Sequence, residues 1–95
     1  MKKEIYLTIL FDYYESLLND KDRECFKDYY FDNLSLGEVA ESHNLSRNAV
    51  HKRLKKIEKD LLNYEEKLKL YEKEQKILNL INDNKLKEQI KKILI

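Results

Sequence analysis

The stretch LSLGEVAESHNLSRNAVHKRLKKIEK, residues 34–59, decides the fold. Ser35 and Glu38 form a capping-box pattern, in which each side chain accepts a hydrogen bond from the other residue's backbone N–H where a helix begins. Asn44 predicts a tight turn, because asparagine adopts the left-handed backbone conformation at low cost. Ser46 is a strong N-cap for a second helix. Two capped helices separated by about three residues predict a helix-turn-helix.

Further helices flank this motif on both sides. Apolar residues at helical spacing predict a helix over about 4–18, and Asn19 predicts the N-cap of another that runs to about Phe31. Within the motif, the small Ala40 lets the second helix approach the first closely. The run Asn82-Asp83-Asn84 predicts a turn with a cap, after which a last helix follows.

Composition excludes several classes of protein. The chain has 95 residues, one glycine and no proline, whereas all-β folds need many tight turns and phosphate-binding loops need several glycines. The single cysteine, Cys25, excludes an internal disulfide and a thiolate zinc site, and its helical spacing predicts a core residue. We therefore predict an all-α fold of five to six helices in a single domain, residues 1–95, with the helix-turn-helix at about 35–60.

The formal charge of +1 hides one strongly basic window. Residues 46–59 carry six basic side chains against Glu58 alone, whereas residues 1–33 have a balance of −3. A focused basic stripe is the usual electrostatic footprint of a phosphate-binding face. Lysine-rich helix surfaces are also commonly just solvated, so charge alone leaves both interpretations open.

The basic window falls on the second helix of the motif, at positions typical of a DNA-binding face. Arg47 can bind a guanine edge through two hydrogen bonds, and Asn48 can bind an adenine edge in the same way. Serine and lysine side chains nearby can bind phosphates. The predicted nucleic-acid-binding residues are Ser46, Arg47, Asn48, His51, Lys52, Arg53, Lys55 and Lys56.

Some of these residues have plainer interpretations. Asn48 can be a first-turn polar residue without a partner, His51 a solvent-facing histidine, and Arg53 a cover for the apolar surface beneath it. His43 is expected to pack its ring at the turn. The two histidines match no metal-ligand spacing, so we predict no metal and no cofactor.

The second helix of the motif meets no glycine or proline before Ile81, which predicts one continuous helix over about 46–81. Apolar residues recur along it at intervals of three to four, with Gln75 as the one polar member. This packing or dimer seam comprises Leu54, Ile57, Leu61, Tyr64, Leu68, Tyr71 and Leu78. The last helix or a second subunit can cover it. We expect a homodimer through mixed helix packing, because a parallel zipper would bring Asp60 of one subunit close to Glu65 of the other, and these two negative charges repel each other.

Residues 18–61 resemble region four of bacterial sigma factors. The resemblance rests on the segments DRE at 22–24, LSLGEVAE at 34–41 and LSRNAVHKRLKK at 45–56. With the aromatic first helix and the continuation LNYEEKLKLYEKEQKI, the whole chain resembles the YlxM family of small bacterial helix-turn-helix proteins.

The resemblance implies a sigma-type fold and a regulatory role. It places five residues at DNA-reading positions: Ser46, Arg47, Asn48, His51 and Lys52. Through gene neighbourhood, it also implies an association with the signal recognition particle pathway.

We therefore predict a DNA-binding regulatory protein that inserts the helix beginning at Ser46 into the major groove of double-stranded DNA. The alternative is an adaptor that uses the same helices to bind the RNA or a protein of the signal recognition particle machinery. The carboxylates are scattered and no nucleophile is paired with a base, so we predict no enzyme and no catalytic residue. Asp12 and Glu15 interrupt the N-terminal apolar run, which predicts a cytoplasmic protein without membrane insertion.

Overall fold

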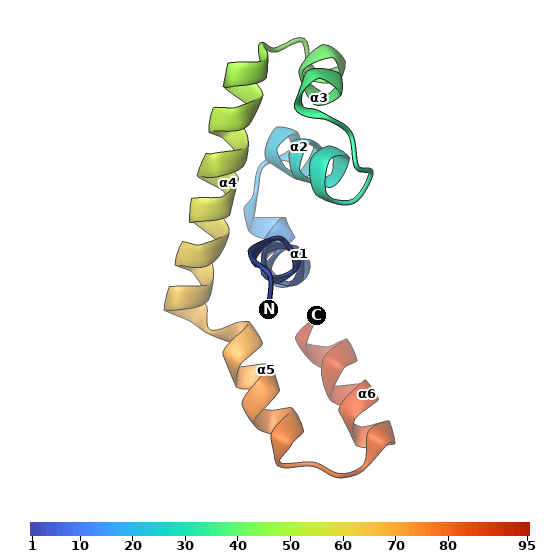
Figure 1. Ribbon diagram of the computed structural model, residues 1–95. Helices are drawn as coiled ribbons and strands as arrows, with labels where there is room; N and C mark the ends of the chain where they lie inside the picture. Colours follow the sequence, from blue (N-terminus) through green and yellow to red (C-terminus); the bar gives the residue numbers. More distant parts are fainter.

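The computed structural model describes all residues, 1–95, and contains helices and no strand (Figure 1). Its six α-helices are α1 (Lys3–Tyr14), α2 (Asp20–Tyr30), α3 (Leu36–His43), α4 (Arg47–Leu68), α5 (Leu70–Asn79) and α6 (Asn84–Leu94). A short 3-10 helix, η1 (Glu15–Leu17), follows α1. The prediction of an all-α fold with five to six helices is confirmed.

The core lies where α4 packs against α1, α2 and α3, which all lie on one side of it (Figure 1). Thirteen buried apolar side chains between Leu7 and Leu61 form one cluster. Phe11 and Phe26 stack with their ring centroids 4.5 Å apart and join α1 to α2. Cys25 is completely buried in this cluster, as predicted.

Side-chain caps begin four of the six helices, α2, α3, α4 and α6, where the sequence predicts them. Asn19 accepts a hydrogen bond from the backbone N–H of Asp22 at 2.8 Å, and Asp83 accepts one from Lys85 at 2.8 Å. The first helix is shorter than predicted, because its α-helical part ends at Tyr14. From there the 3-10 turn and the extended residue Leu18 lead directly into the Asn19 cap.

The prediction of one continuous helix over residues 46–81 is wrong. The helix α4 ends at Leu68, and Lys69 adopts a left-handed backbone conformation, with φ 57° and ψ 32°, before α5 begins. A non-glycine residue in this conformation costs about 1–2 kcal/mol. Other contacts must therefore stabilise the break between the two helices.

The buried Glu65 carboxylate and the Tyr14 hydroxyl supply those contacts. Glu65 accepts hydrogen bonds from the backbone N–H groups of Tyr71 and Glu72, both at 3.1 Å. The Tyr14 hydroxyl accepts one from the N–H of Leu70 at 3.1 Å and donates to Glu65 at 2.5 Å. Three N–H groups that a helix leaves unpaired at its start are thus satisfied. Burial, and then the bond to Glu65, raise the pKa of Tyr14 to about 12.

The break divides the predicted apolar seam into parts with different surroundings. Three members lie buried in the core: Leu54, Ile57 and Leu61. Tyr64 and Tyr71 are half-buried against the core, whereas Leu68, beside the break, keeps 44% of its surface exposed. Leu78 is half-buried on α5. Most of the seam therefore packs within this chain.

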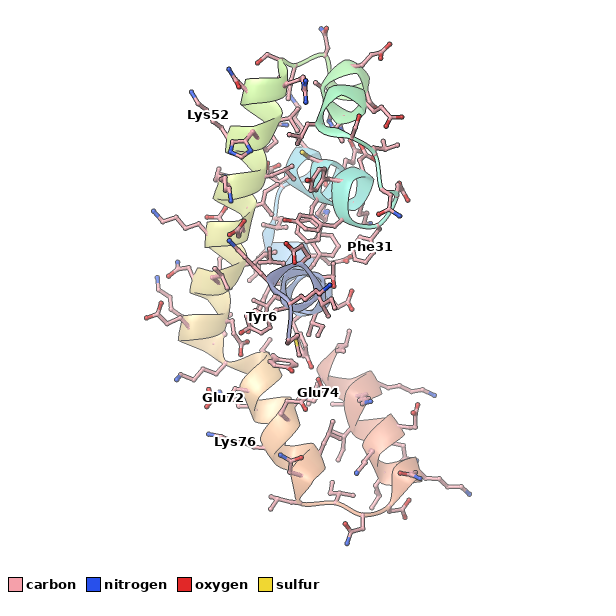
Figure 2. The ribbon with its side chains drawn as sticks, viewed as in Figure 1. Tyr6, Phe31, Lys52, Glu72, Glu74 and Lys76 are labelled. Atoms are coloured by element: carbon pink, nitrogen blue, oxygen red, sulfur yellow. The ribbon has the colours of Figure 1, made fainter.

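The helices α5 and α6 form a hairpin that extends from the core and gives the molecule extents of 48 × 24 × 24 Å (Figure 1). The last helix, α6, packs on α5. The sequence left open whether this helix or a second subunit would cover the seam, and α6 is thus one of the two expected partners. Glu74 is the one buried residue of the hairpin, on the side of α5 toward α6 (Figure 2). No helix is both long enough and apolar enough to cross a membrane.

Candidate nucleic-acid interface

The helix-turn-helix consists of α3, a short turn and α4. At the start of α3, Ser35 Oγ accepts a hydrogen bond from the Glu38 N–H at 3.1 Å, and Glu38 accepts one from the Ser35 N–H at 3.0 Å. The predicted capping box is therefore confirmed, and these bonds lower the pKa of Glu38. Asn44 turns the chain with a left-handed backbone, φ 55° and ψ 47°, and Leu45 N–H bonds back to Ala40 O at 2.8 Å.

A hydrogen bond from His43 joins the motif to α2. His43 Nε2 lies 2.7 Å from Asp28 Oδ2, and the histidine side chain is largely buried. The ring packs at the turn as predicted, but its partner lies fifteen residues earlier, at a distance that no spacing pattern indicates. This contact fixes the end of α3 against α2 and so sets the direction in which the chain enters α4.

The first turns of α4 present polar and basic side chains to solvent. Seven of the eight predicted residues are exposed. Six of these form no ion pair with α2, and we call them the reading face: Ser46, Arg47, Asn48, His51, Lys52 and Lys55. Lys52 projects from the side of α4 opposite α1, α2 and α3 (Figure 2). Ser46 also caps the helix by accepting a hydrogen bond from the Ala49 N–H at 3.1 Å. Arg47 and Lys52 form no ion pair within the chain, so both cations are available to a ligand.

The other two predicted residues, Arg53 and Lys56, are engaged with α2. Lys56 Nζ lies 2.9 Å from Oδ2 of Asp22, and Arg53 Nε lies 3.8 Å from its Oδ1. Asp22 is only 4% exposed, and the hydrogen bond to it raises the pKa of Lys56. A buried carboxylate needs such partners to offset its desolvation. These two cations therefore first serve the packing of α2 on α4.

A groove of about 190 Å³ lies beside the reading face, between the start of α1, the end of α2 and α4. His51 and Lys55 line it from α4, and Tyr29 and Tyr30 line it from α2. Glu58, also in its lining, lies 3.7 Å from Lys55. Burial, and then the Glu58 carboxylate, raise the pKa of Tyr30. The sequence did not indicate this groove because its walls come from helices far apart in the chain.

Comparison with known protein families agrees with this geometry. The family UPF0122, described as "Putative helix-turn-helix protein, YlxM / p13 like", matches the chain over residues 1–95. The chain belongs to this family. The resemblance to the YlxM family is therefore confirmed.

Individual UPF0122 proteins are similar along most of the chain. One from Caldanaerobacter subterraneus subsp. tengcongensis is 45% identical over 86 residues, which cover 90% of this chain and 72% of that protein. One from Bacillus cereus is 44% identical over 90 residues, or 95% of this chain and 80% of the relative. A third, from Clostridium acetobutylicum, is 48% identical over 73 residues, or 77% and 63% of the two chains.

The UPF0122 chain holds no arrangement of side chains suited to bind a metal ion. No three His, Cys, Asp or Glu side chains come together at one place. The polar groups that do converge are the reading face, the pair of cations on Asp22 and the groove beside α4. Of these three, only the reading face combines cations without an ion pair, Arg47 and Lys52, with hydrogen-bonding side chains at the start of a helix.

Proposed function

We propose that this UPF0122 protein binds double-stranded DNA through the reading face and acts as a regulator of transcription. The observation that carries the proposal is the set of six exposed polar or basic side chains at the capped start of α4. In helix-turn-helix proteins, the second helix lies in the major groove and its N-terminal residues contact base edges. The core supports this role, because Val50 and Leu54 fix the inward side of the same turns.

Within the reading face, we assign two kinds of contact. Arg47 and Asn48 are the residues with side chains suited to base edges, since each can form a pair of hydrogen bonds to one base. Ser46, Lys52 and Lys55 are suited to phosphate oxygens, which fix the position of the helix without reading sequence. The pairing of Arg53 and Lys56 with Asp22 makes them weaker candidates for direct contact.

Two measurements test the proposal. Selection of bound fragments from a pool of random duplexes identifies a preferred sequence, and fluorescence anisotropy then gives its affinity over a range of salt concentrations. We expect Arg47→Ala to cost about 1–3 kcal/mol on the preferred sequence and to reduce discrimination between sequences. Lys52→Ala is expected to weaken all duplexes alike and to lower the salt slope by about one.

The matched control is Lys67→Ala, an exposed lysine in the last turn of the same helix. It changes the net charge by the same amount as Lys52→Ala but lies far from the reading face. Binding that does not depend on salt, or that Lys67→Ala weakens as much as Lys52→Ala, would contradict the proposal.

A second candidate function is an adaptor that binds RNA of the signal recognition particle machinery or one of its proteins. The groove favours it, because Tyr29 and Tyr30 lie beside His51 and the cation Lys55. Unstacked RNA bases pack on tyrosine rings next to positive charge. Retention on duplex DNA, on signal recognition particle RNA and on its GTPase, compared at physiological salt, separates the two functions. Tyr29→Leu should weaken RNA binding and leave duplex DNA binding unchanged if the adaptor function is correct.

A further inference from the structure

The hairpin of α5 and α6 exposes an apolar edge that this chain does not cover. Leu86 and Ile93 on α6 are 48% and 81% exposed, although α6 buries part of its opposite edge on α5. Seven residues, close to two helical turns, separate them, so both lie on the same side of the helix. Large aliphatic side chains that stay exposed together on an amphipathic helix are typical of an interaction surface.

The same helix is strongly basic. Residues 84–94 contain four lysines, at positions 85, 87, 91 and 92, against Glu88 alone, which gives a balance of +3. None of these lysines forms an ion pair within the chain: all the ion pairs of the structure join residues before position 77. An occupant of this edge must therefore combine apolar surface with carboxylates.

A surface with these properties lies where α1 and η1 meet the end of α2 and the residues that follow it. A hollow of about 270 Å³ is lined by Phe11 and Phe31 and carries the charged side chains Asp12, Glu15, Lys27 and Asp32. None of its carboxylates forms an ion pair, and Phe31 keeps 47% of its surface exposed. Burial, and then the neighbouring Glu15, raise the pKa of Asp12, as expected for a carboxylate that lies beside another one and forms no ion pair.

We propose that two copies of this chain associate by reciprocal docking, in which the Leu86–Ile93 edge of each α6 packs on the Phe11–Phe31 hollow of the other copy. The unpaired α6 lysines then lie beside the unpaired carboxylates of the hollow, so charge and apolar surface match at once. Exchange in both directions satisfies both surfaces of both copies and closes with two-fold symmetry.

This association leaves the reading face uncovered. Phe31 lies on the side of the molecule away from α4, whereas Lys52 projects from the outer side of α4 (Figure 2). Both copies of the reading face therefore stay exposed to a ligand. The proposal is independent of nucleic-acid binding, and its test uses the protein without nucleic acid.

Charge reversal on each surface tests the proposal. Light scattering after size exclusion, over a concentration series, should give twice the 11.6 kDa of one chain for the wild type. The α6 variant, Lys85→Glu with Lys92→Glu, should be a monomer, and so should the hollow variant, Asp12→Lys with Asp32→Lys. An equal mixture of the two variants should form a dimer, because each reversed surface then meets its complement.

Two controls keep the result interpretable. Lys73→Glu, an exposed lysine of α5 without an ion pair, reverses charge outside both surfaces and should leave the dimer intact. Circular dichroism should show that all variants keep the wild-type helix content, since every altered side chain is exposed. A wild type that is monomeric throughout the series, or two variants that stay monomeric when mixed, would overturn the proposal. So would a monomeric wild type that binds vesicles of phosphatidylglycerol through α6.

Discussion

Residues 1–65 and residues 66–95 consist of similar charged helices, but the two regions are stabilised differently. Fifteen of the sixteen buried residues lie in the first region, and only Glu74 lies in the second. One carboxylate oxygen of Glu74 has no hydrogen-bond partner, and burial raises its pKa. Helix-forming sequence is common to both regions, whereas dense packing is confined to one. Since tertiary packing supplies most helical stability in proteins, the hairpin should open locally far more often than the core.

The largest expected effect compares one leucine from each region. Leu10→Ala removes a completely buried side chain from the core and should lower the free energy of unfolding by about 3 kcal/mol. Leu78→Ala removes a half-buried side chain from the hairpin and should cost about 1 kcal/mol. Urea denaturation followed by circular dichroism measures both. Equal losses would show that the hairpin is packed as firmly as the core.

The contact that joins the regions gives the next effect. Glu65→Ala leaves two backbone N–H groups and the Tyr14 hydroxyl without their acceptor, which should cost about 2 kcal/mol. The hairpin should also lose its fixed direction, so the distance distribution between spin labels at positions 59 and 76 should broaden. The adjacent exposed Glu66→Ala serves as the control and should change neither quantity. An unchanged distribution in Glu65→Ala would mean that the break does not depend on this carboxylate.

The raised pKa of Tyr14 predicts a dependence on pH at the same contact. In the unfolded chain the hydroxyl ionises near its ordinary value of 10.0, and in the folded protein near about 12. The stability that it contributes is therefore complete below pH 10 and is lost as the pH rises through about 12. Tyr14→Phe should lower the free energy of unfolding by about 1 kcal/mol at neutral pH. Urea denaturation at a series of pH values should show that the difference in this free energy between the variant and the wild type decreases toward zero over this range. Tyr13→Phe is the control at neutral pH. The Tyr13 hydroxyl forms no hydrogen bond within the chain, so its removal should cost less than the removal of the Tyr14 hydroxyl.

The smallest effect has an informative sign. Lys69→Gly removes the backbone strain of a lysine in the left-handed conformation between the two regions. Glycine also makes the unfolded chain more flexible, which offsets part of this gain, so the protein should be stabilised by about 0.5 kcal/mol. In a continuous helix, the same change would instead destabilise by about 1 kcal/mol. Lys67→Gly, two residues earlier and inside α4, should show that second sign. Thermal unfolding of both variants decides between a break and a continuous helix.

The sequence predicted the features of the fold that depend on neighbours along the chain. The caps at Asn19, Ser35, Ser46 and Asp83 were all recognisable, because each involves groups within three residues. The break at Lys69 was not, because a residue 51 positions before Glu65 completes it. Local helix propensity favoured continuity, and the tertiary hydrogen bonds from Tyr14 overcame it.

The candidate site likewise has features that the sequence predicted and features that it did not. Exposure of the reading face followed from helical periodicity, since Val50 and Leu54 had to face the core. The engagement of Lys56 with Asp22 did not follow, because the two residues are 34 positions apart and neither lies in a pattern that links them. Charge counting over a window treats all cations alike, whereas the fold separates paired cations from free ones.

The helix α4 carries the reading face near its start and Glu65 near its end without an interruption. Every residue inserted into an α-helix rotates the rest of that helix by about 100° and advances it by about 1.5 Å. A single insertion between Ile57 and Leu61 would thus turn Glu65 away from Tyr14. Seven inserted residues would restore its direction but carry it roughly 10 Å too far. The number of residues in this segment is therefore as constrained as their identity, and changes in chain length belong in turns such as residues 80–83.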